Sequence, residues 1–287
     1  MNAAGAEKEG VIYTTAELRV KVTIEKGILA GTVSLAGTAK YGENLTVITK
    51  EITNEKPGTY SYQWYRIDED EKVTEIANAT GESYTLTTED IGKKIKVVVT
   101  SAYCEGSLET PTDTIAKGDA TVKNAPIAAK NLTYDQGKNI TLINAENASV
   151  TGGELQYAFS ENGTYSTSLP TVTEAGTYSV YYKVVGDRNH NDTEPVKIDV
   201  TVSKAAPSYQ APTDISATCG DKLSTIQLPN GFEWTDEDVT LEAGDTETGT
   251  QVTKKAKYVP KDTKNYKEGT DIEITIQVTH DSEVRDA

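Results

Sequence analysis

Apolar and polar residues alternate along most of the chain, in short runs that are typical of β-strands with one buried face. The clearest runs lie at 59–67, 93–99 and 177–183. No stretch keeps an apolar period of 3.6 residues over a helical length. The sequence therefore predicts an all-β fold. The residues expected to point inward in these three strands are Tyr60, Tyr62, Trp64, Ile95, Val97, Val99, Tyr178, Val180 and Tyr182.

Runs of this kind group into three stretches of roughly 80–90 residues, each with about seven candidate strands separated by Gly, Asn, Asp or Pro. That number and spacing of strands is typical of a two-sheet sandwich. We therefore predict tandem β-sandwiches arranged as an elongated rod. The predicted parts are the last strand of a preceding module (1–27), module 1 (28–118), module 2 (119–204) and module 3 with a short C-terminal tail (205–287).

The first predicted strand belongs to the run AELRVKVTIEKG at 16–27. It is similar to the runs that close modules 2 and 3, at 196–204 and 271–280. We interpret the strand at 16–26 as the remnant of a preceding module, and the alternative is a strand that belongs to module 1. A severed strand would fray, pair with a sheet edge of module 1, or pair with another copy of the chain.

Turn residues divide the predicted strands. We expect turns at Gly106 and at Asn230-Gly231, and a bend at 260–265 before the last strand. Glu161-Asn162-Gly163 is expected to form a hairpin turn, because Asn-Gly accepts the positive φ that such a turn requires.

Module 1 contains, in this order, AKYGENLTV (39–47), YQWYR (62–66) and ANATGESYTLTTEDIGKKIKVVV (77–99). Through these residues it resembles the bacterial immunoglobulin-like (Ig-like) modules of Gram-positive (Firmicute) cell-surface proteins. Modules 2 and 3 resemble tandem repeats of the same proteins through the residues at 155–192, 219–234 and 258–278. The resemblance is specific for the type of module and says little about activity.

The cysteines depart from the pattern of antibody domains, in which a disulfide crosses the two sheets. Cys104 and Cys219 fall in different predicted modules, so we expect no disulfide between them. The core of module 1 must then depend on packing around Trp64. Cys219 stands where the resembling repeat more often has an aromatic residue, and we expect a buried, inert thiol there rather than a reactive one.

The net charge of −16 and the pI near 4.6 exclude partners that require a basic surface, namely nucleic acid and anionic membranes. No run approaches ~18 apolar residues, so we expect no segment that inserts into a membrane. The start, MNAAGAEKEG, lacks the apolar core of a signal peptide. We therefore expect the targeting and anchoring segments of the parent protein to lie outside this chain.

Candidate catalytic groups are few. The histidines, His190 and His280, lack the spacing of a metal pair such as H-E-x-x-H, and no Walker loop or G-x-S-x-G turn occurs. Acidic residues gather in expected turns at 68–71 and 235–239, where solvated charge is ordinary. We therefore predict a protein that is not an enzyme, with no cofactor and no catalytic, cofactor-binding or metal-binding residue.

Three local patterns leave a second interpretation open. The loop from Asp187 to Glu194 places oxygen-bearing side chains at nearly alternate positions, as calcium loops do, but Asn and Asp also form turns for backbone reasons alone. Tyr65 and Tyr181 are candidates for a sugar-stacking platform or for ordinary cross-strand pairs. Lysine–asparagine bonds clip some surface modules of similar architecture, and sequence alone does not place one. We favour the structural interpretation of each pattern.

Together these features predict a non-catalytic structural or adhesive segment of a secreted or wall-attached bacterial surface protein. It would act as a stalk or spacer that presents the neighbouring domains of its parent protein. The alternative is a carbohydrate- or protein-binding (adhesin) module, including one accessory to a secreted glycoside hydrolase. Its partner would be a host or cell-wall glycan or protein. A concave aromatic patch on one module would distinguish the binding module from the spacer.

Overall fold

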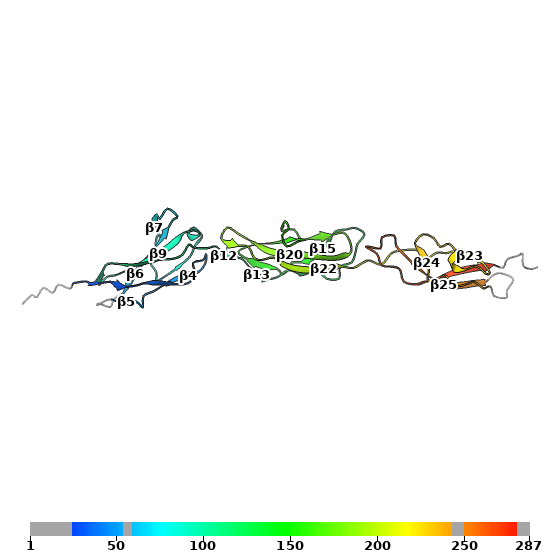
Figure 1. Cartoon of the computed structure of the whole chain (residues 1–287), viewed down its shortest axis with the longest axis horizontal. Helices are drawn as coiled ribbons and strands as arrows, with labels where there is room; N and C mark the ends of the chain where they lie inside the picture. The colour runs from blue at the N-terminus through cyan, green and yellow to red at the C-terminus, as the bar shows by residue number, and fades with distance from the viewer. Residues whose placement is uncertain (1–24, 54–58, 243–249, 280–287) are drawn as a thin grey trace, which may run out of the picture. The chain divides into compact units, whose positions relative to one another are not determined.

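The computed structural model describes residues 25–53, 59–242 and 250–279 (Figure 1). These residues form β-strands, turns and two single-turn 3-10 helices, η1 (Thr88–Asp90) and η2 (Leu223–Thr225). The predicted all-β class is therefore confirmed. Within the same residues, no helix is long and apolar enough to cross a membrane. Most of the strand expected at 16–26 lies outside the described residues.

The chain divides into two compact units, unit 1 up to Ala116 and unit 2 from Lys117 onward. Unit 1 has one hydrophobic core. Unit 2 has two separate cores, one in a first lobe at 117–204 and one in a second lobe at 205–279. The cores of the two lobes share no residue, so each lobe buries its own apolar side chains.

Unit 1 is a two-layer sandwich. Its strands are β1 (Gly27–Ile28), β2 (Ala30–Gly31), β3 (Ser34–Ala36), β4 (Asn44–Ile48), β5 (Ile52–Thr53), β6 (Tyr60–Ile67), β7 (Val73–Glu75), β8 (Ser83–Thr85), β9 (Lys94–Ser101), β10 (Cys104–Glu105) and β11 (Leu108–Pro111). A four-stranded sheet, β11-β9-β6-β7, forms one layer and a three-stranded sheet, β3-β4-β8, forms the other. Two short pairs, parallel β1-β10 and antiparallel β2-β5, complete unit 1.

The core of unit 1 follows the alternation of its sequence. Trp64, Ile95, Val97 and Val99 are each 0% exposed, as the two-residue period of a strand predicts. Trp64 of β6 lies opposite Val97 of β9, and its indole Nε1 donates a hydrogen bond of 2.9 Å to the carbonyl oxygen of Gly81. Because the ring is buried and its N–H is satisfied, Trp64 can anchor the core without a disulfide.

The first lobe of unit 2 is a sandwich of shorter strands. They are β12 (Gly118–Asp119), β13 (Thr121–Asn124), β14 (Ile127–Ala128), β15 (Ile140–Thr141), β16 (Ile143–Asn144), β17 (Ser149–Thr151), β18 (Gly153–Ala158), β19 (Thr171–Val172), β20 (Gly176–Gly186), β21 (His190–Asn191) and β22 (Val196–Val202). The sheet β18-β20-β22 is three-stranded, and the remaining strands form pairs. Val180 and Tyr182 are buried as predicted, and they pack with Leu142 and Val200.

The second lobe has one four-stranded sheet in the order β23-β26-β25-β24. Its strands are β23 (Ile215–Thr218), β24 (Phe232–Trp234), β25 (Thr250–Tyr258) and β26 (Ile272–Thr279). The core joins Ile274, Ile276 and Val278 of β26 to Leu223 of η2 and to Leu241, which lies outside the strands. Side chains from non-strand segments therefore supply much of the second layer in this lobe.

Two Asn-Gly turns have different backbone conformations. Gly231 has a φ of +92°, and an added Cβ would lie 2.6 Å from Cε2 of Tyr258, so glycine is required there. The chain also reverses at 161–163, but neither Asn162 nor Gly163 has a positive φ. The expectation of a positive φ at that hairpin was wrong. The loop is longer than a two-residue hairpin and does not need a mirror-image turn.

The cysteines are both free, and they differ in burial. Cys104 is 4% exposed and belongs to the interior of unit 1. Cys219 is exposed, so the expectation of a buried thiol there was wrong. Cys219 lies just beyond the end of β23 and before Gly220, whose φ is +93°. The chain turns at these residues, so the Cys219 side chain lies outside the part of the sheet that the core covers.

Candidate functional site

Asp187 begins the loop that was considered for calcium. Its Oδ1 accepts a hydrogen bond from the backbone N–H of Asn189 (2.8 Å) and lies 2.7 Å from Nδ1 of His190. The hydrogen bond with His190, followed by that from Asn189, holds the pKa of Asp187 below its usual value. The carboxylate therefore stabilises the turn that leads from β20 into β21.

Asp192 is held by protein donors at the other end of the same loop. It accepts hydrogen bonds from Nζ of Lys183 (2.7 Å) and from the backbone N–H of Gly186 (2.9 Å). These two contacts, Lys183 first, lower the pKa of Asp192. In the described part of the chain, no three His, Cys, Asp or Glu residues gather where they could hold a metal ion. The contacts favour the turn interpretation of the Asp187–Glu194 loop.

The tyrosines considered as a sugar platform occupy ordinary positions in their sheets. Tyr65 pairs with Lys96, whose Nζ lies 5.9 Å from the centroid of the ring. Tyr181 pairs with Ala158 on one side and with Lys197 on the other. Both tyrosines are half-buried, and cross-strand packing accounts for them.

A lysine–asparagine bond requires a lysine that is buried beside an amide and an acid. Across residues 25–53, 59–242 and 250–279, the buried polar side chains are those of Asp90, Ser101 and Asn265. No lysine is among them, so these residues do not assemble the reacting set.

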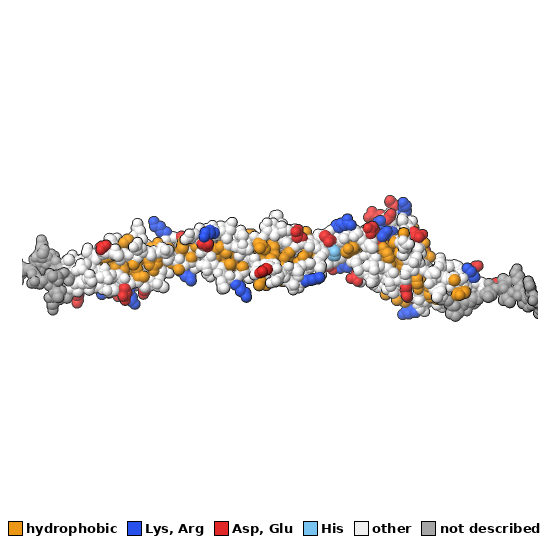
Figure 2. Space-filling model, turned by 180° about the vertical axis from the view of Figure 1, so that it is seen from behind, with side chains coloured by type: hydrophobic (Ala, Val, Ile, Leu, Met, Phe, Trp, Pro, Cys, Tyr) orange, Lys and Arg blue, Asp and Glu red, His pale blue; other side chains and the backbone are white. Residues whose placement is uncertain are grey.

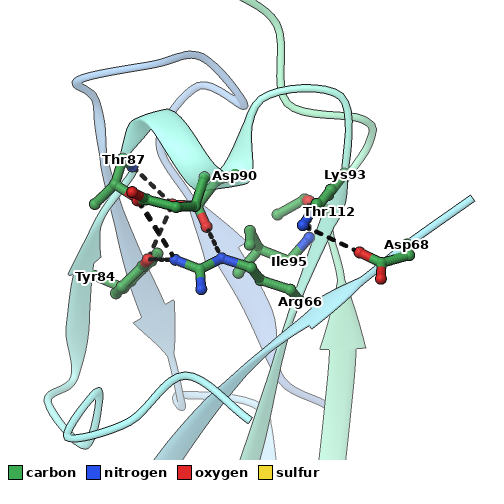
Figure 3. Close-up of polar contacts among 9 residues, drawn as sticks. Arg66, Asp68, Tyr84, Thr87, Asp90, Lys93, Ile95 and Thr112 are labelled. Atoms are coloured by element: carbon green, nitrogen blue, oxygen red, sulfur yellow. Dashed lines mark hydrogen bonds and ion pairs between the residues drawn. The ribbon is translucent and has the colours of Figure 1, made fainter. Parts of the chain in front are cut away.

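Asp90 connects the two layers of unit 1 (Figure 3). Its carboxylate is 0% exposed, and its Oδ1 lies 2.5 Å from Nε of Arg66 in β6. Its Oδ2 accepts hydrogen bonds from the hydroxyl of Tyr84 in β8 (2.9 Å) and from the hydroxyl (2.9 Å) and backbone N–H (2.7 Å) of Thr87. Because β6 and β8 belong to different sheets, one carboxylate ties both layers together.

The charges of this network support one another. Partial burial opposes the charge of Arg66, but the hydrogen bond and negative charge of Asp90 outweigh it and raise the pKa of Arg66. Partial burial and then the hydrogen bond to Asp90 raise the pKa of Tyr84, which keeps its hydroxyl a donor. The network can hold the sandwich together, and its carboxylate is already saturated with donors. The T-x-x-D spacing of Thr87 and Asp90 matches a capping box, but no local pattern in the sequence points to Arg66 as the partner of Asp90.

The link between the two lobes of unit 2 is hydrogen-bonded on both sides. Ser203 is bridged to Thr133 in the first lobe, and Ala205 is bridged to Tyr266 in the second lobe. Lys204 lies between the two bridged residues, and its Nζ donates to a carbonyl oxygen of the second lobe (2.6 Å). So short a link leaves few backbone dihedral angles through which one lobe can turn against the other.

Asn265 is the buried polar side chain of this joint, with 6% exposure. Its Oδ1 accepts a hydrogen bond from the backbone N–H of Ala175 in the first lobe (2.7 Å), and its Nδ2 donates to Asp262 (2.9 Å). The Asn265 side chain lowers the pKa of Asp262, which therefore stays ionised at neutral pH and orients the amide. Lys264 and Glu174 form an ion pair beside it. The sequence predicts only a bend here, because Ala175 lies 90 residues away from Asn265 in the chain.

Residues 31–112 match a family model described as the AIR9 A9 domain, which is an Ig-like domain. The matched region lies within unit 1 and contains the Asp90 network. With the strand topology, the match supports an Ig-like β-sandwich. No curated protein sequence matches the chain significantly.

Several solved structures align with the chain at low similarity. Immunoglobulin domains 1–4 of Sidekick-1 share 12% identity, with 93% of this chain and 74% of that chain covered and a TM-score of 0.20. Extracellular domains 3–5 of Drosophila OTK share 10% identity, with 89% and 96% covered and a TM-score of 0.20. Bacteroides ovatus SGBP-B, solved with a mixed-linkage heptasaccharide, shares 14% identity, with 86% and 67% covered and a TM-score of 0.19. Scores at this level support no conclusion about ligands or partners.

Proposed function

We propose that this chain is a non-catalytic spacer segment of an extracellular protein, in which it holds neighbouring domains apart. The observation that carries the proposal is the joint of unit 2, where two lobes with separate cores are coupled through Asn265 and a one-residue link. Separate cores add length module by module, and a fixed joint prevents adjacent modules from folding back on each other. We also propose that the three cores correspond to three modules, with boundaries near 118 and 204.

The proposed setting is the surface or cell wall of a Gram-positive bacterium. The resemblance of the sequence to Firmicute surface modules supports this setting, and the match in unit 1 supports the Ig-like fold alone. The net charge of −16 suits a soluble, self-repelling surface segment. The proposed partners are the neighbouring domains of the parent protein and, in an adhesive role, a host or cell-wall glycan or protein.

Small-angle X-ray scattering of the full chain tests the spacer role. Three modules of about 35–40 Å placed end to end would span on the order of 110 Å, which for a rod gives a radius of gyration of about 30 Å. A compact protein of 287 residues would have a radius of gyration of about 19 Å. A measured value close to the smaller figure would contradict the proposal.

Replacing Asn265 by alanine is expected to loosen the joint between the lobes. The substitution leaves the buried backbone N–H of Ala175 without its acceptor, at a cost of about 1–3 kcal/mol. Electron–electron distance measurements can follow the lobes, with spin labels on Cys219 and on T201C and with Cys104 replaced by alanine. We expect a broader distance distribution in Asn265→Ala than in the labelled parent.

Asn162→Ala, in an exposed turn of the first lobe, is the matched control and should keep the narrow distribution. Equal widths for Asn265→Ala and the labelled parent would show that the Asn265 amide does not hold the joint.

A further inference from the structure

A pocket opens at the joint of unit 2. Its volume is about 450 Å³, which lies within the range of small-molecule sites. Tyr134 of the first lobe lines it together with Tyr258 and Tyr266 of the second lobe. The link and the residues after it contribute the smaller side chains Ala205, Ala206, Pro207 and Ser208. The pocket is therefore a concave aromatic surface that neither lobe forms alone.

Neighbouring rings hold the three tyrosines in place. Tyr134 and Tyr266 meet edge to face, with ring centroids 5.2 Å apart. Tyr258 stacks on Tyr209 at 4.8 Å and contacts Phe232 at 5.1 Å. All three lining tyrosines are half-buried, so part of each remains accessible. Because the rings are already ordered, a ligand that stacks on them loses little affinity to the ordering of side chains.

The polar lining of the pocket comes from an unusual turn. The carbonyl oxygen of Asp135 accepts the backbone N–H of Lys138 (2.8 Å), and the residues between them, Gln136 and Gly137, have φ values of +47° and +78°. Two positive φ angles in succession are characteristic of a type I′ turn, and glutamine rarely adopts that conformation. Asp135 and Gln136 both line the pocket, next to the tyrosines.

We propose that this pocket binds a neutral oligosaccharide of pyranose rings. A pyranose has an apolar C–H face that suits a tyrosine ring, and its edge carries adjacent hydroxyl groups. Oδ2 of Asp135 already accepts a hydrogen bond from Nζ of Lys138 (3.0 Å), so its Oδ1 is the oxygen that accepts from such hydroxyls. The amide of Gln136 both accepts and donates. The sugar site goes beyond the spacer role, and the spacer role does not depend on it.

Charge and hydrogen-bonding groups favour a neutral oligosaccharide over two other classes of ligand, anionic glycans and proline-rich peptides. An anionic glycan requires a basic surface, whereas the chain carries −16 and acidic and basic side chains are interspersed on the face drawn in Figure 2. A proline-rich peptide also docks on aromatic grooves. It offers no adjacent hydroxyl groups for Asp135 and Gln136 to bind.

Titration calorimetry of the full chain tests the proposal. The neutral probes are cellohexaose, laminarihexaose, mannohexaose and chitohexaose, and the other probes are a heparin oligosaccharide and a polyproline peptide. We expect at least one neutral probe to bind. Tyr134→Ala and Gln136→Gly should each weaken that binding about tenfold, because one removes a stacking ring and the other a hydrogen-bonding amide. Tyr134→Phe should retain most of the affinity.

The variants distinguish a loss of contacts with the ligand from a loss of the folded structure around the pocket. Gln136→Gly removes the amide while favouring the positive φ of the turn, so it should fold even if Tyr134→Ala disturbs the joint. Tyr65→Ala, in unit 1, should bind as the wild type does. The proposal is overturned if no neutral probe binds up to about 10 mM, if only heparin or polyproline binds, or if Gln136→Gly leaves the affinity unchanged. None of these results would alter the radius of gyration, so failure of the sugar site and failure of the spacer role are distinguishable.

Discussion

Replacing Trp64 by alanine is expected to lower the free energy of unfolding of unit 1 by about 4 kcal/mol, the usual cost of truncating a buried aromatic side chain. Trp64 is 0% exposed, so alanine leaves a cavity at the centre of the sandwich. It also removes the indole N–H that donates to the carbonyl oxygen of Gly81. For a unit of this size the loss corresponds to a decrease in melting temperature of about 15–25 °C, which scanning calorimetry can measure.

The second tryptophan provides an internal control. Trp234 is 7% exposed and packs in the core of the second lobe. The chain has two tryptophans, so the fluorescence of Trp64→Ala reports unit 2 alone. In this variant the unfolding midpoint of unit 2 should match that of the wild type, because the core around Trp64 and the core around Trp234 are separate. Two results would contradict separate cores: a shift in the unfolding midpoint reported by Trp234 fluorescence, or a decrease of less than about 5 °C in the melting temperature of unit 1.

Replacing Asp90 by alanine is expected to destabilise unit 1 by about 3 kcal/mol, because it leaves a charged and several polar groups without their buried acceptor. Arg66, Tyr84 and the backbone N–H of Thr87 all lose a hydrogen bond. Arg66 is 21% exposed at its side chain and can regain some water, which keeps the cost below that of a fully enclosed ion pair. Urea unfolding in a Trp234→Phe background, in which Trp64 is the remaining tryptophan, measures the change by fluorescence and circular dichroism.

A double-mutant cycle with Arg66→Met isolates the ion pair from the other contacts of Asp90. We expect the double variant to lose less free energy of unfolding than the two single variants lose in sum, with a coupling energy of about 2 kcal/mol. Lys197→Met is the matched control, because Lys197 pairs with Asp199 at the surface and should change the stability by less than about 1 kcal/mol. Additive effects of Asp90→Ala and Arg66→Met would show that the pair contributes no coupling.

Strand faces were predicted well because they depend on local order along the chain. Ile95, Val97 and Val99 are buried, as their alternation with Lys94 and Lys96 predicted. Predictions failed where the strand ended. Cys219 continues the inward side of β23 by position, but a turn carries it to an exposed place. The alternation of inward and outward side chains holds only for residues of a strand that is paired in a sheet.

Candidate sites were harder to predict because they combine residues from distant segments. The loop at 187–194 could be examined from sequence alone, since its donors and acceptors lie within a few residues of one another. The pocket could not, because Tyr134 lies far along the chain from Tyr258 and Tyr266. The tyrosines that were singled out by sequence, Tyr65 and Tyr181, lie in ordinary cross-strand pairs.

By itself, the sequence determined the all-β class, the inward face of the strands at 59–67, 93–99 and 177–183, and the turn at Asn230-Gly231. Each of these follows from the geometry of neighbouring residues on one strand or in one turn. Only the tertiary structure decided that Asp90 meets Arg66, that Asn265 reaches Ala175, and that tyrosines of two lobes enclose one pocket. Contacts of this kind depend on how whole strands and lobes pack against each other, and no local pattern of side chains specifies that packing.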